Sequence, residues 1–236
     1  MQVPYSFLTP WLERRTPLAP FIDLEKISPN KEFGGFLAIQ RTIPIHESAN
    51  LAAESLSNSW TKVNTYMKDA LEIIHADEDE PQWLDRWEAE QIQEQLGPPP
   101  VNCQPIYLVS VSEGESERLV YIGKTSSTQG RFKGGHSAFT KLLHPKFDGL
   151  KKTLYLAAVV LLTEEMDYLP LEWVKPLAKA EELLSDIEAQ CIFNFKPELN
   201  IHHVFRDNSR WQTTLHIQNV TGVTSFLNDK FCYPMR

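Results

Sequence analysis

Glu188 is the carboxylate of this chain whose surroundings most clearly favour a positively charged partner. It lies one helical turn from Leu184 and Ile192, in a stretch whose apolar residues recur with helical spacing. We therefore expect its side chain at the edge of an apolar face, where a carboxylate is costly unless it is paired or binds a cation. The residues alone leave both partners open, and they favour an ion pair with a lysine or arginine over a metal ion.

A basic stripe precedes Glu188, although the formal net charge of the chain is −8. Asp148 is its one acidic residue, whereas acidic residues crowd the segment 69–94. A local stripe matters more to a phosphate backbone than the sum over the chain does. A solvated lysine-rich face explains the same residues, and charge alone favours that explanation. The stripe consists of Lys124, Arg131, Lys133, Lys141, Lys146, Lys151 and Lys152.

Two tyrosines and a histidine add groups that can exchange protons. Tyr107 and Tyr121 fall in two strand-like stretches, and His136 follows Arg131 by five residues, so these two can share roughly one side of a helix. Taken singly, each is more often structural than catalytic. Their order along the chain is the informative feature.

That order resembles the GIY-YIG nuclease family. Pro105-Ile106-Tyr107 is answered by Tyr121-Ile122-Gly123, and the residues that follow are Arg131, His136, Glu188 and Asn200. The resemblance covers residues 105–200. It implies a three-stranded antiparallel sheet flanked by helices, and hydrolysis of phosphodiester bonds with one Mg²⁺ or Mn²⁺ ion per active site.

The resemblance also implies a role for each catalytic residue. Glu188 matches the metal-binding glutamate, and Arg131 matches the arginine that neutralises charge growing on the phosphate in the transition state. We favour Tyr107 as the base that activates water, with Tyr121 and His136 supporting its deprotonation. His136 is the alternative base.

The remaining predicted site residues are the asparagine that ends the motif and three residues that follow Tyr121 and Ile122 in the sequence. Asn200 matches the closing asparagine of the catalytic set, and Gly123, Lys124 and Lys133 are predicted to contact the substrate backbone. A glycine at position 123 would let the chain turn sharply and approach a phosphate. The sequence departs from the family at Pro105, which replaces a glycine, and in an insertion over residues 163–176, with Trp173 as its expected anchor.

Patterns of apolar residues predict the elements that position these groups. Strands over 106–111 and 119–122 form a hairpin across a polar, glycine-containing turn. A helix over 128–143, a strand over 154–162 and a helix through 177–191, which Pro197 stops, follow it. We therefore predict an α+β fold with a nuclease core at residues 101–200.

Extensions flank the predicted core. Residues 1–100 combine a proline-rich arm, with one short strand near 33–39, and two helices, and the chain Gly97-Pro98-Pro99-Pro100 marks their end. The helices are expected over 50–75 and after Pro81, the second with Leu84, Trp87 and Leu96 on its apolar side. Residues 201–236 form a short C-terminal extension with a strand over 211–217 and a helix over 223–231.

Composition bounds the location and partners. The three cysteines lack metal-site spacing and are expected to be free thiols, and no apolar run reaches the roughly 18 residues of a membrane span. No signal peptide is evident at the N-terminus, so we expect a cytoplasmic protein without a membrane partner.

A compact core with extensions favours a restriction-type endonuclease, a homodimer that cuts duplex DNA at a specific site. The acidic N-terminal region is a candidate contact for a protein partner. The alternatives are a nuclease of the same family acting on RNA or single-stranded DNA, and a non-catalytic nucleic-acid-binding or interaction module.

Overall fold

The computed structural model describes residues 6–21, 34–50, 54–78, 80–125, 137–163, 168–205 and 213–234. Three predicted site residues, Arg131, Lys133 and His136, lie outside the described residues, as does the first part of the helix predicted over 128–143. The predicted site residues that the structure describes are Tyr107, Tyr121, Gly123, Lys124, Glu188 and Asn200.

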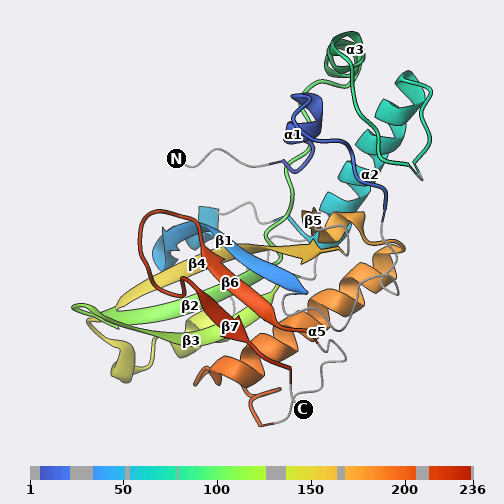
Figure 1. The fold of residues 1–236 in the computed structure, drawn as a ribbon. Coiled ribbons are helices and arrows are strands. Elements are labelled where there is room, and N and C mark those ends of the chain that lie inside the picture. The colour runs from blue at the N-terminus through green and yellow to red at the C-terminus, as the bar shows by residue number, and fades with distance from the viewer. Residues whose placement is uncertain are drawn as a thin grey trace.

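A seven-stranded sheet forms the body of the fold, with strand order β3-β2-β4-β1-β6-β7 and with β5 paired to β4 (Figure 1). The strands are β1 (Gly35–Pro44), β2 (Ile106–Glu113), β3 (Ser116–Lys124), β4 (Lys151–Leu162), β5 (Tyr168–Pro170), β6 (Leu215–Asn219) and β7 (Lys230–Cys232). Helices pack against this sheet, as an α+β fold requires.

The expectation of a three-stranded antiparallel sheet is not confirmed. Strands β3, β2 and β4 pair antiparallel as predicted, but β4 also pairs along its length with β1, which comes from the N-terminal arm. Strand β6, from the C-terminal extension, then adds parallel to β1. The sheet is larger because β4 is apolar on both faces and long enough to be a central strand with neighbours on both sides.

The α-helices are α1 (Thr9–Leu12), α2 (Leu56–Ile73), α3 (Arg86–Leu96), α4 (Ser137–Lys141) and α5 (Leu177–Phe195), and the short 3₁₀ turns are η2 (Ile45–Asn50), η3 (Pro145–Phe147) and η4 (Leu171–Trp173). Helix α2 begins later than predicted because Ser55 caps it, accepting a hydrogen bond from the Asn58 N–H at 3.3 Å. Asp85 and Glu88 form a capping box that begins α3.

Helix α5 runs along one face of the sheet, and α1, α2 and α3 gather beyond one end of it (Figure 1). The main core lies between α5 and the sheet, where Ile106, Leu108 and Ile122 meet Leu184 and Ile187. A second core joins α1, α2 and α3 and includes Trp173, which is buried. A third lies on the opposite face of β2, β3 and β4 and includes Tyr107, Leu142 and Phe147.

Two local predictions are wrong. Trp87 is 64% exposed, although its spacing suggested the apolar side of α3. The helix predicted over 223–231 is instead a set of turns followed by β7, because the Asn219 side chain donates to the Phe226 carbonyl at 2.7 Å and accepts from the Thr221 N–H at 3.1 Å. Such side-chain bonds to the backbone compete with a helical ladder.

The predicted free thiols are confirmed: Cys103, Cys191 and Cys232 are all buried and unpaired in disulfides. Among the described residues, no helix is long and apolar enough to cross a membrane.

Candidate active site

The rings of Tyr107 and Tyr121 meet over Gly123. Strand pairing puts the Cα atom of Tyr107 directly opposite that of Gly123, and Tyr121 lies two residues back along β3, on the same face. The two ring centroids are 5.9 Å apart. A Cβ atom added to Gly123 would lie 2.5 Å from Cζ of Tyr107 and 2.8 Å from Cε1 of Tyr121. Position 123 therefore needs a glycine for space, because any side chain would collide with both rings.

The two tyrosines differ in exposure. Tyr107 is 0% exposed and packs with Val109 and Leu156, whereas Tyr121 is partly exposed at the border of the same cluster. A group that touches substrate needs access to it, so Tyr121 is the better placed of the two to contact a phosphate. The role of Tyr107 as a base stays a prediction.

Asn200 fixes the backbone between Tyr121 and Gly123. Its Oδ1 accepts the Ile122 N–H at 2.9 Å, and its Nδ2 donates to the Ile122 carbonyl at 2.8 Å. The neighbouring Leu199 N–H donates to the Val120 carbonyl at 2.9 Å. Within the described part of the chain β3 ends the strand order, so these bonds satisfy edge groups that no described strand reaches. The Asn200 side chain thereby makes the two backbone hydrogen bonds that a neighbouring strand would make, and it fixes the backbone at Ile122.

Glu198 ties this edge segment to its surroundings. It forms ion pairs with Arg118 of β3 and with Lys146 of η3, the second at 2.8 Å. Partial burial acts to raise the pKa of Glu198, but the hydrogen bonds and charges of Lys146 and Arg118 outweigh it, so the pKa is lowered. Lys141 donates to the Leu199 carbonyl at 3.1 Å. Lys141 and Lys146, two members of the basic stripe, thus have structural partners.

Lys124 and Glu188 form a second group on the other side of the strand. The Lys124 Nζ atom lies 3.8 Å from Oε2 of Glu188, and their side chains are 24% and 19% exposed. Lys124 also donates a hydrogen bond to the Ser185 hydroxyl. The ion pair that the residues alone favoured is therefore present. Sequence reasoning missed Ser185, whose one signal is its position three residues before Glu188 on the same helix.

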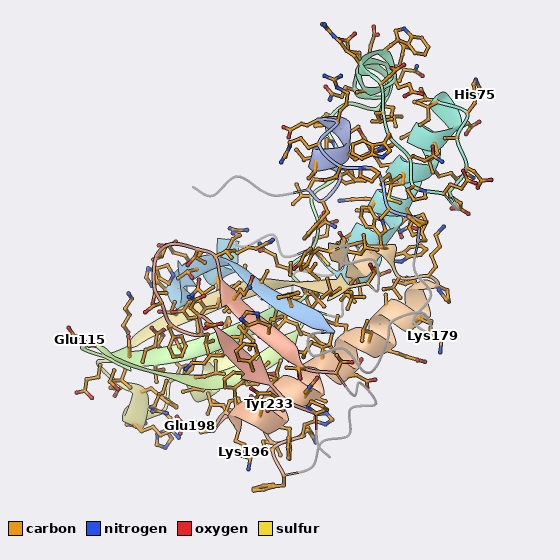
Figure 2. All side chains as sticks on the ribbon, viewed as in Figure 1. His75, Glu115, Lys179, Lys196, Glu198 and Tyr233 are labelled. Atoms are coloured by element: carbon orange, nitrogen blue, oxygen red, sulfur yellow. The ribbon has the colours of Figure 1, made fainter. Side chains whose placement is uncertain are left out.

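The two groups share the last residues of β3 but use its opposite faces. Side chains alternate along a strand, so Tyr121 and Gly123 point away from α5, and Ile122 and Lys124 point towards it. A ligand that contacts both groups would therefore have to pass the edge or the end of β3. Figure 2 marks the two ends of α5, the helix that carries Glu188, by Lys179 and Lys196, and Glu198 lies close to the second.

Glu188 is the one carboxylate among the predicted site residues that the structure describes. No cluster of three or more His, Cys, Asp or Glu side chains able to bind a metal occurs among the described residues. A single carboxylate nevertheless fits Mg²⁺, which keeps several waters and is often bound through one or two carboxylates plus substrate phosphates. The ammonium group of Lys124 near Glu188 indicates that this position accommodates positive charge.

Comparison with known proteins gives no match: no family model, no curated protein and no solved structure is similar to this chain.

Proposed function

We propose that this protein is a divalent-metal-dependent endonuclease of the GIY-YIG type that hydrolyses phosphodiester bonds of duplex DNA. One observation carries the proposal: Tyr107 and Tyr121 pack against Gly123, and the next residue, Lys124, lies beside Glu188. The last residues of β3 thus carry an aromatic hydroxyl on one face and, on the other face, a cation beside the Glu188 carboxylate of α5, and the proposed chemistry uses these three kinds of group.

Each group has a task in hydrolysis. A bound metal ion would supply Lewis-acid stabilisation of the phosphate charge, and Glu188 would hold it. Lys124 would neutralise a phosphate oxygen. As a water oxygen bonds to phosphorus, the water would give its proton to a basic group of the site; the bond to the leaving sugar oxygen breaks, and that oxygen would take a proton from solvent. Tyr121 would contact the water, while Tyr107, buried in the core, would support the ring of Tyr121. Arg131 and His136 stay predicted members of this set.

Duplex DNA is the substrate that we propose, cut at a specific site by a homodimer that places one active site on each strand. A monomer in gel filtration, both alone and on DNA, would contradict this arrangement.

The first test is cleavage of unmethylated phage and plasmid DNA with Mg²⁺ or Mn²⁺, beside an EDTA control. Glu188→Ala is expected to lower the rate by about a thousandfold, the cost of removing a major electrostatic group from a transition state. Glu182→Ala is the matched control, because Glu182 lies on the same helix in a half-exposed pair with Lys179. Tyr121→Phe is expected to lose more activity than Tyr107→Phe.

The products distinguish the alternatives. Discrete fragments that need metal and Glu188 support a sequence-specific enzyme. A smear of products would support a nuclease but contradict cleavage at a specific sequence. Cleavage restricted to RNA or single strands changes the substrate, and cleavage of no nucleic acid by wild-type protein refutes the catalytic proposal.

A further inference from the structure

Two side chains of α5 contact the ammonium group of Lys124. One is the Glu188 carboxylate, 3.8 Å away, which is longer than the roughly 2.7–2.9 Å of a direct charge-assisted hydrogen bond. The other is the Ser185 hydroxyl, to which Lys124 donates. The ammonium therefore neutralises Glu188 through space while its hydrogen bond goes to the serine.

Ser185 is set up to receive that bond. Its hydroxyl donates to the Glu181 carbonyl of the preceding turn at 2.8 Å, so its one proton is used and its lone pairs accept from Lys124. Ser185 and Glu188 are three residues apart on α5 and so lie on one side of the helix. A lysine at the end of β3 can move between them by side-chain rotation alone.

We propose that Lys124 is an internal counter-ion of the metal site, which a divalent cation displaces from Glu188, and that Ser185 is the anchor that retains the displaced ammonium beside the site. This rests on the proposed function for the identity of the metal ligand. The displaced ammonium stays next to the scissile phosphate, so metal binding and the placement of Lys124 are one event. Ser185 is a positioning residue in this scheme.

The scheme predicts opposite effects for its two residues. Without Lys124, a cation at Glu188 meets one positive charge fewer and binds more tightly. Without Ser185, the ammonium loses its second anchor and forms a direct ion pair with Glu188, so a cation binds more weakly. A merely structural role would weaken binding in both variants.

The test is direct Mn²⁺ binding to the full chain without DNA, followed by the electron paramagnetic resonance of free Mn²⁺. Lys124→Met is expected to tighten binding by about tenfold, and Ser185→Ala to weaken it by about threefold. Ser185→Thr, which keeps the hydroxyl, is expected to restore the wild-type affinity. Glu188→Gln is expected to remove this binding.

Lys179→Met is the control, since it removes the same charge from an exposed part of α5 paired with Glu182. The inference is overturned if Lys124→Met binds Mn²⁺ no more tightly than Lys179→Met, or if Ser185→Ala shifts affinity in the same direction as Lys124→Met. It is also overturned if Glu188→Gln binds like wild type.

Cleavage assays separate this inference from the proposed function. The predicted shifts in Mn²⁺ affinity without cleavage of any nucleic acid would support the counter-ion and refute the nuclease. Cleavage that depends on Glu188, together with equal Mn²⁺ affinities in Lys124→Met and Lys179→Met, would support the nuclease and refute the counter-ion role of Lys124.

Discussion

The two halves of the candidate site are built by different physical means. The aromatic half, Tyr107 and Tyr121 over Gly123, depends on close packing, and a single added methyl group would collide with both rings. The ionic half, Lys124 with Glu188, depends on a few polar contacts at partly exposed side chains. We infer that the aromatic half governs folding of this part of β3. Changes to the ionic half are expected to cost little stability and, under the proposed function, most of the activity.

Gly123→Ala tests the aromatic half and has the largest expected effect on stability. The added Cβ would lie 2.5 Å from Cζ of Tyr107, which is fully buried, so the rings and the strand must shift. We expect a loss of about 3 kcal/mol in the free energy of unfolding. Urea denaturation followed by circular dichroism measures it.

Gly114→Ala is the control for that measurement. Gly114 has φ of 57° with no atom within 4 Å of an added Cβ, so its substitution costs about 1 kcal/mol of backbone strain and no packing. Equal losses in the two variants would show that space around Gly123 is not what requires a glycine.

Asn200→Ala tests the hydrogen bonds at the edge of β3, the strand that carries residues of both halves. The expected loss in the free energy of unfolding is smaller. It leaves the N–H and the carbonyl of buried Ile122 without their partners, at a cost of about 2 kcal/mol. Amide hydrogen exchange is expected to speed up at Ile122 and to stay unchanged at Leu37 in β1. Unchanged protection at Ile122 would exclude the edge role of Asn200.

Glu198 has the smallest expected effect, which is a pH-dependent contribution to the free energy of unfolding. Because its folded-state pKa is lowered below its ordinary value of roughly 4.3, its pairs with Arg118 and Lys146 stabilise the protein above that pH and lose this effect as pH falls through the folded pKa. The partners are about half exposed, so we expect about 0.5 kcal/mol.

The measurement compares the stabilities of wild type and Glu198→Gln at pH 7 and at pH 3. The difference between them should shrink at the lower pH. A constant difference would mean that Glu198 contributes through packing and not through its charge.

The elements around the site follow closely from local patterns. The hairpin predicted over 106–111 and 119–122 appears as β2 and β3, and the helix predicted through 177–191 is α5. Their periodicity is set by neighbouring residues, which a sequence displays directly. The pairing of β1 with β4, and of β6 with β1, was missed because pairing between segments far apart in the chain leaves no local pattern.

The sequence by itself determined the order of the motif residues, the alternation that separates Tyr121 from Lys124, and the helical position of Glu188. Only the tertiary structure decided that Gly123 leaves room for two rings, that Asn200 completes the edge of β3, and that Ser185 receives Lys124. These roles depend on distances between atoms from separate elements, which exist once the sheet and α5 have packed together.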